Sequence, residues 1–262
     1  MAEMRLTVKT LIIRSLASLL VLSSSAAWAD AASLFRDGKF AEAAAVGTKE
    51  GSPAAELLAA RSLLAIAAYR TADKARALAL IDQAGKLASS AMGGNARNVD
   101  ALLQSAIAVG YRAKLTNSPG DGKMARKMME QARGLDPSNA LAWASIGGWH
   151  GESVVTLGGF LAGTMLGAKK GEFIKAFDKA LTLDRVNPSF PTFYAFTLLG
   201  LDAANAPRAR ELLSRAVALP ATDGFEALLK SKAQQVLPLL QKGDVAGARA
   251  LVKQHQAFGL LA

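Results

Sequence analysis

Apolar residues recur at intervals of three and four along most of the chain, which is the spacing of one face of an α-helix. Glycine, proline and asparagine interrupt the pattern, and Ser52-Pro53 combines a capping side chain with a first-turn proline. No stretch shows the convincing two-residue alternation that indicates a strand. The sequence therefore predicts an all-α protein. After a short helix that opens near residue 38, helices are expected near 53–69, 72–90, 96–114, 123–134, 139–151, 153–167, 170–183, 189–203, 207–219, 224–242 and 244–257.

Four of these helices share a pattern of small and large residues at offsets 0, 4, 7 and 10. These offsets place all four positions on one helical face, and an alanine at the third position lets a neighbouring helix approach closely. The pattern recurs after 48, 48 and 36 residues. It predicts about ten to twelve helices stacked as antiparallel pairs. The four sets are Ala77/Ile81/Ala84/Leu87, Ala125/Met129/Ala132/Leu135, Phe173/Phe177/Ala180/Leu183 and Ala209/Leu213/Ala216/Leu219.

The stretch 125–139 reads Ala-x-x-x-Met-x-x-Ala-x-x-Leu-Asp-Pro-x-Asn and resembles the second helix of a tetratricopeptide repeat (TPR) with the turn after it. The turn at 184–188 departs from that pattern because its proline is displaced. The longer unit around Trp149 and His150 also resembles the divergent repeats of the regulator-of-microtubule-dynamics type. It is similar, too, to the helical-repeat periplasmic proteins associated with TRAP transporters. The resemblance implies a TPR-like α-solenoid over residues 30–262, with a concave face that receives a partner.

The first 29 residues are typical of a secretory signal peptide. Arg5 and Lys9 give a basic start, Leu16–Leu22 is mostly apolar, and the stretch ending at Ala29 is an A-x-A cleavage site. The sequence therefore predicts cleavage after Ala29 and a periplasmic or secreted protein with no stable membrane span. An uncleaved anchor is the alternative, although the charge-free run 15–29 is shorter than the roughly 20 residues that cross a bilayer.

The amino-acid composition limits the kinds of site and partner that the protein can have. The chain has no cysteine, which excludes disulfides, thiolate metal sites and cysteine nucleophiles. Its 2 histidines are too few for a histidine-built zinc site unless carboxylates complete it. The formal charge is +10, and cleavage after Ala29 would remove Glu3, Arg5, Lys9 and Arg14 and leave +8. That charge favours acidic partners or anionic lipid headgroups, with solubility alone as the other explanation. The Lys and Arg residues are scattered over helix faces, so we expect no nucleic-acid partner. No metal and no other cofactor is predicted.

The cluster His150-Gly151-Glu152 is the one group of polar residues whose types suggest metal binding or proton transfer. Residues two apart on a helix point about 200° away from each other, so His150 and Glu152 could converge only across a break at Gly151. A helix-capping or interhelical hydrogen bond is the structural interpretation of His150, and ligand contact is the functional one. No catalytic residue is predicted, because no catalytic motif is present.

Aromatic residues supply the remaining candidates. Trp143, Trp149, Phe160 and Tyr194 could line an apolar pocket, although aromatics at these spacings are more often core residues. A tryptophan beside a histidine is a reasonable anchor in a binding groove. The predicted binding residues are therefore Trp143, Trp149, His150 and Glu152.

These observations support two hypotheses about function. The first is an exported, non-catalytic scaffold that binds a protein or peptide of the cell envelope through its concave face. The second is a soluble component that binds a small hydrophobic solute and is associated with a transporter. An enzyme is not expected.

Glycines 159, 163 and 167 lie in a run without charge, 153–168. Four-residue glycine spacing lets membrane helices pack closely, but sixteen residues are too few to span a bilayer. Several glycines in one exposed helix would each cost about 1 kcal/mol relative to alanine. We therefore predict that this helix is buried, with its glycine face against a neighbouring helix.

Overall fold

The computed structural model describes residues 30–95 and 97–261, so the predicted signal peptide lies outside the described residues. Within these two ranges the chain forms helices and turns and no strand, which confirms the all-α prediction. The helices are α1 (Ala31–Arg36), α2 (Phe40–Glu50), α3 (Pro53–Tyr69), α4 (Lys74–Met92), α5 (Val99–Thr116), α6 (Pro119–Leu135), α7 (Ala140–Leu161), the π-helical η1 (Ala162–Leu166), α8 (Lys170–Leu183), α9 (Ser189–Leu201), the 3₁₀ turn η2 (Ala203–Asn205), α10 (Ala206–Ala218), α11 (Gly224–Gln241) and α12 (Val245–His255).

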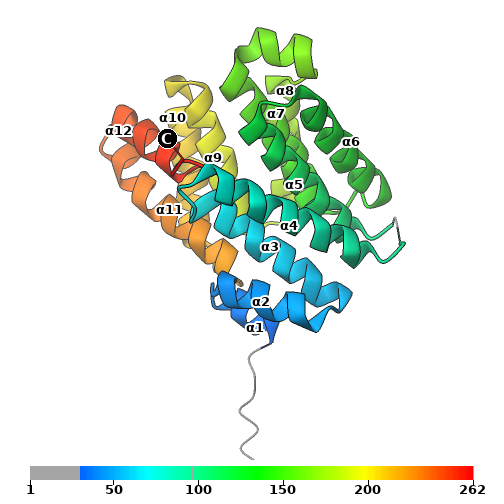
Figure 1. The fold of residues 1–262 in the computed structure, drawn as a ribbon. Coiled ribbons are helices and arrows are strands. Elements are labelled where there is room, and N and C mark those ends of the chain that lie inside the picture. The colour runs from blue at the N-terminus through cyan, green and yellow to red at the C-terminus, as the bar shows by residue number, and fades with distance from the viewer. Residues whose placement is uncertain (1–29, 96, 262) are drawn as a thin grey trace, which may run out of the picture.

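Consecutive helices pack against each other through most of the chain. The most extensive contacts join α2 with α3, α3 with α4, α4 with α5, α5 with α6 and α7 with α8. Helices α9, α10 and α11 continue the array, and α12 returns against α9 and α11 (Figure 1). This is a solenoid-like stack of helix pairs, as the repeat pattern predicts.

The repeat pattern marks the buried face of its four helices. The first three positions are at most 5% exposed in every set, and each third-position alanine is fully buried. At the fourth position Leu87 is buried, whereas Leu135, Leu183 and Leu219 are half-buried at the helix ends. The alanines allow the neighbouring helix to come close, and the larger residues fill the space beside it.

The segment 153–168 differs from its prediction. Helix α7 extends through it to Leu161, but Gly158 has a φ of +77° and η1 follows at once. A Cβ atom on Gly159 would meet nothing within 4 Å, and Phe160 is 80% exposed. The prediction that this glycine face packs against a neighbour is therefore wrong. The pattern assumed one continuous helix, and the left-handed residue with the π-turn rotates the later residues out of that register.

Two other glycines of α7 make the close contact. A Cβ atom on Gly147 would lie 2.7 Å from Cδ2 of Phe177, and one on Gly151 would lie 2.7 Å from Cδ2 of Phe173. Both phenylalanines belong to α8 and are at most 1% exposed. The rings of α8 therefore occupy the space that side chains would take on this face of α7. Trp149 lies between the two glycines in sequence and points away from α8.

Candidate functional site

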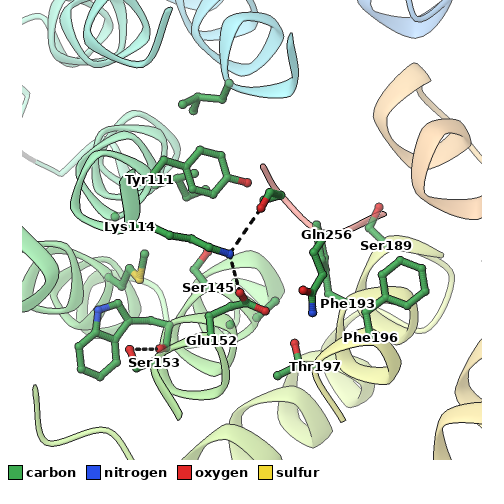
Figure 2. A pocket seen from close by; sticks show the side chains of 18 of the residues that line it. Tyr111, Lys114, Ser145, Glu152, Ser153, Ser189, Phe193, Phe196, Thr197 and Gln256 are labelled. Carbon is green, nitrogen blue, oxygen red and sulfur yellow. Dashed lines mark hydrogen bonds and ion pairs between the residues drawn. The ribbon is translucent and has the colours of Figure 1, made fainter. Parts of the chain in front are cut away.

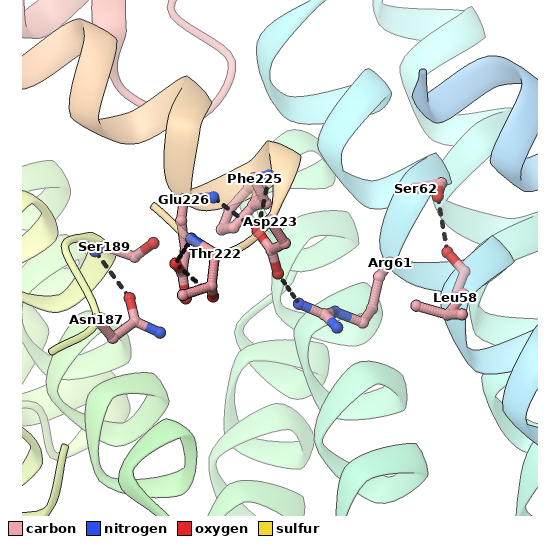
Figure 3. A network of polar contacts seen from close by, with 9 residues as sticks. All are labelled: Leu58, Arg61, Ser62, Asn187, Ser189, Thr222, Asp223, Phe225 and Glu226. Carbon is pink, nitrogen blue, oxygen red and sulfur yellow. Dashed lines mark hydrogen bonds and ion pairs between the residues drawn. The ribbon is translucent and has the colours of Figure 1, made fainter. Parts of the chain in front are cut away.

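The two ends of the helix array meet. Gly224 begins α11 and lies so close to Gly38, in the turn between α1 and α2, that a Cβ atom on Gly224 would collide with the Gly38 backbone. Beside this contact, Nη2 of Arg61 in α3 pairs with Oδ2 of Asp223 at 3.2 Å (Figure 3). Asp223 also caps α11 by accepting hydrogen bonds from the backbone N–H groups of Phe225 and Glu226. The array consequently closes on itself, and its concave side becomes an interior.

The segment that follows α12 covers this interior. The backbone N–H of Phe258 donates to the carbonyl oxygen of Ala68 at 2.7 Å. The ring of Phe258 packs edge-on against Tyr111, with 5.0 Å between the ring centroids. Nζ of Lys114 donates to the carbonyl oxygen of Ala257 at 3.4 Å. The C-terminal segment therefore lies across α3 and α5, on the side where a concave groove was expected.

A partly enclosed cavity of about 600 Å³ remains inside the closed array. Most of its wall comes from α3, α5, α7, α9, α11 and the C-terminal segment. The wall is mainly apolar and uses nine of the chain's 16 aromatic residues (10 Phe, 3 Tyr and 3 Trp). Its volume lies in the range of about 300–1,000 Å³ that small-molecule sites occupy. The nine are Phe35, Tyr69, Tyr111, Trp149, Phe177, Phe190, Phe193, Phe196 and Phe225.

Two ion pairs line the cavity, Arg61 with Asp223 and, between the helices α5 and α7, Lys114 with Glu152. Nζ of Lys114 in α5 is 2.8 Å from Oε2 of Glu152 in α7, and each side chain is 31% exposed. Figure 2 shows Tyr111, Gln256 and Thr197 around this pair. Lysine and glutamate neutralise each other there, so the pair offers both a donor and an acceptor to a polar group without adding net charge to the cavity.

Several buried polar atoms of the wall have no hydrogen-bond partner among the described residues. They are Oη of Tyr69, Oγ of Ser189 and Nε2 of His255, and all three residues line the cavity. The side chains of Tyr69 and Ser189 are 6% and 4% exposed. Buried polar groups are normally paired, because an unpaired one costs about 1–3 kcal/mol. These atoms are therefore hydrogen-bonding groups that a polar group entering the cavity could reach.

These groups are neutral at physiological pH. Burial raises the pKa of Tyr69 well above its usual value of 10.0, and it raises the pKa of Tyr111 to about 12. Burial lowers the pKa of His255 to about 4, with a smaller contribution from the charge of Lys232. The phenols thus keep their protons and the imidazole has lost one. Apart from the ion pairs and the carboxylate of Glu226, the cavity presents uncharged hydrogen-bonding groups.

Two of the four predicted binding residues line the cavity. Trp149 is one of the lining residues, and its Nε1 donates to the carbonyl oxygen of Gly122 at 2.8 Å. Glu152 contributes the carboxylate that pairs with Lys114. Helix α7 is continuous through Gly151, so His150 and Glu152 point in different directions, as their spacing requires.

The other two residues lie elsewhere. His150 is 2% exposed, and its Nδ1 accepts a hydrogen bond from the backbone N–H of Lys169 at 3.2 Å. Burial, assisted by the charge of Arg126, lowers the pKa of His150 to about 4. Trp143 is half-buried where α6 meets α7, donates to the carbonyl oxygen of Pro137 at 2.9 Å and has Arg133 over its ring. His150 thus joins α7 to the start of α8 by a hydrogen bond, which is the structural role considered for it from the sequence.

Sequence reasoning missed the polar residues that α5 contributes. Gln104, Tyr111 and Lys114 all line the cavity. They stand at offsets 0, 7 and 10, which places them on one face of a helix that is otherwise rich in alanine, leucine and valine. A polar stripe on an apolar helix was therefore the available signal. Tyr69 and Ser189 carry no such signal, because their environment depends on how distant helices meet.

Comparisons with known proteins give no family. No family model matches the chain, and no curated protein matches it. Among the described residues, no cluster of three or more histidine, aspartate or glutamate side chains could hold a metal ion. No helix in the described ranges combines the length and the apolar character that crossing a membrane requires.

Proposed function

We propose that the protein binds a small, mainly apolar molecule with a polar group in the cavity, without catalysis, as the solute-binding component of an envelope transport system. The observation that carries this proposal is the composition of the cavity wall. Nine aromatic residues surround about 600 Å³, while Tyr69, Ser189 and His255 leave polar atoms unpaired. A molecule with an apolar body would displace water from the aromatic wall, and its polar group would pair with those atoms.

The scaffold hypothesis requires an open groove for a peptide. In this fold, Ala257 and Phe258 hold the C-terminal segment over α3 and α5 by hydrogen bonds and ring packing. A peptide would have to displace that segment before it reached the concave wall, whereas a small molecule fits the space that is already present. This difference favours the solute as the partner. The transport association rests on the resemblance of the repeats alone.

The test is identification of the ligand by native mass spectrometry of the purified protein, followed by thermal shift with the molecule found and with long-chain carboxylic acids. A ligand at 100 times its Kd stabilises the folded state by about 2.7 kcal/mol. For a chain of this length, that raises Tm by roughly 5–10 °C.

The chain offers a matched pair of variants. Gly148 lines the cavity and Gly134 does not, and an added Cβ atom at either position meets nothing within 4 Å. Gly148→Leu should fill the cavity and abolish the shift, while Gly134→Leu should preserve it. If Gly148→Leu bound as tightly as wild type, or if neither a co-purified molecule nor a thermal shift were found, the cavity would not be a binding site.

A further inference from the structure

Exposed apolar side chains are concentrated at one place, the end of α7 with η1 (residues 156–166), which we call the α7 tip. Phe160 is 80% exposed, Leu161 48% and Met165 42%. Met124 of α6 is 53% exposed, and α6 packs against η1 through Gly122 and Leu166. These four are the majority of the six large apolar side chains that are exposed in the described residues. Such a concentration on one surface indicates an interaction site.

Basic residues surround the tip. No charged residue occurs between 153 and 168, whereas Lys169 and Lys170 follow directly and Lys123 and Lys127 flank Met124 on α6. All four lysines are exposed, and none forms an ion pair with a described residue.

Acidic groups nearby are mostly neutralised. Asp121 pairs with Arg112 at 3.2 Å, and Glu130 pairs with Arg126 at 2.8 Å. Glu172, in the first turn of α8, is the acidic side chain that remains. The surroundings of the tip are therefore positive, which complements a surface that combines negative charge with an apolar layer.

The tip also satisfies its own polar groups. The hydroxyl of Thr164 donates to the carbonyl oxygen of Phe160 at 3.1 Å. The backbone N–H groups of Gly167 and Ala168 donate to the carbonyl oxygens of Gly163 and Ala162, both at 3.0 Å. Unpaired backbone groups are costly in an apolar medium, so this pairing makes shallow entry into lipid feasible.

The base of the tip is held firmly. Nη1 of Arg126 donates to the carbonyl oxygen of Gly167 at 3.3 Å, and the backbone N–H of Lys169 donates to buried His150. Leu157, Met165 and Leu166 belong to the tip and also line the cavity. The exposed apolar surface is thus continuous with one end of the cavity wall.

We infer that the α7 tip docks on an anionic lipid surface. Phe160 and Leu161 enter the boundary between headgroups and acyl chains, while the four lysines contact the headgroup phosphates. The protein lies on the membrane without spanning it, with one end of the cavity facing the lipid. Docking is independent of whether the cavity holds a ligand, so each proposal can fail while the other stands.

Vesicle co-flotation tests the inference. The probes are vesicles of phosphatidylglycerol and phosphatidylcholine in equal parts, and vesicles of phosphatidylcholine alone. The protein should float with the first and bind the second at least about tenfold more weakly, because each lysine near an anionic surface strengthens binding about fivefold. Phe160→Ser with Leu161→Ser should reduce partition by about 100-fold, which corresponds to loss of two buried apolar side chains. Lys169→Gln with Lys170→Gln should reduce it about tenfold or more.

Val186→Ser is the matched control, because Val186 is 60% exposed in the connection between α8 and α9, away from the tip. It should leave partition unchanged. Circular dichroism and Tm establish that each variant is folded. A Phe160→Trp variant should show a blue shift of its emission when anionic vesicles are added.

Undiminished flotation of folded Phe160→Ser with Leu161→Ser would overturn the inference, as would equal binding to both kinds of vesicle. Sedimentation velocity provides one further outcome. If wild type self-associates, fails to bind vesicles and becomes monomeric on substitution of Phe160 and Leu161, the tip is a protein interface and the lipid inference is wrong.

Discussion

The contact between α7 and α8 gives the most stringent test of the packing. Gly151→Ala adds one methyl group to α7 at the point where Phe173 of α8 and Thr197 of α9 converge. The new Cβ atom would lie 2.7 Å from Cδ2 of Phe173 and would collide with the methyl group of Thr197. Both neighbours are at most 3% exposed, so neither can turn into solvent. The helices must therefore move apart.

The expected magnitude follows from two opposing effects. Overpacking of a well-packed core costs about 1–3 kcal/mol, and two rigid neighbours place this site at the upper end. Alanine recovers about 1 kcal/mol of helix propensity relative to glycine. We therefore expect Gly151→Ala to lower the free energy of unfolding by about 2 kcal/mol.

The neighbouring Gly148 is the control, because a Cβ atom there meets nothing within 4 Å. Gly148→Ala should gain the helix propensity without the collision and raise the stability by about 0.5–1 kcal/mol. Urea denaturation followed by circular dichroism gives both values from the midpoint, provided that the slope is unchanged. A Gly151→Ala variant as stable as wild type would refute the close approach of α7 to α8 and α9.

Two further predictions concern the core. Ala132→Leu and Ala180→Leu replace fully buried third-position alanines, so each should lower the free energy of unfolding by about 1–3 kcal/mol in urea denaturation. Unchanged midpoints for both would contradict the repeat register. The pKa of His150 falls from 6.5 to about 4 in the folded chain, so between these values only the unfolded chain takes up the proton. Proton uptake by His150 of the unfolded chain therefore has little effect on stability above pH 6.5. It lowers the free energy of unfolding as the pH falls, by about 2 kcal/mol between pH 7 and 5. His150→Gln should show a smaller midpoint difference between these pH values, and an equal one would refute the shift.

Much of the fold was predictable because its determinants are local. Spacing along one helix identifies the buried face, and the first three positions of all four sets are buried as expected. Capping is equally local, since Ser52 accepts a backbone hydrogen bond at the start of α3, where its position before Pro53 predicts it. The polar stripe of Gln104, Tyr111 and Lys114 on α5 could have been found by the same rule. Features that depend on a single helix can therefore be predicted from the sequence.

Closure of the array was not predictable, because it depends on residues far apart in the sequence. Gly38 and Gly224 meet without any feature in their own neighbourhoods that relates one to the other. The cavity depends on that contact and on the position of the C-terminal segment, so it could not be predicted from the sequence either. Trp149 and Glu152 were identified for their residue types, while Tyr69 and Ser189 acquire their role only when the helices close.

The glycines of α7 and η1 show that even within one stretch of helix the packing of a residue can depend on a partner elsewhere in the chain. Gly147 and Gly151 are four residues apart, as are Gly159 and Gly163. The first pair faces Phe177 and Phe173, whose own four-residue spacing on α8 matches it; the second pair faces no ring. Spacing alone cannot distinguish them. The complementary pair of phenylalanines on the adjacent predicted helix was the available signal.

Helix α7 contributes to the packing of the array, to the wall of the cavity and to the exposed apolar surface. Gly151 allows its close approach to α8 and α9, and Trp149 and Glu152 both line the cavity. A helix that only completed a repeat could end near Ser153, yet α7 continues to Leu161 and η1 follows. The continuation coincides with one of the two long repeat intervals, of 48 rather than 36 residues. Because it carries both cavity wall and exposed apolar surface, the additional length supplies the elements that the proposed ligand binding and the proposed membrane docking would each require.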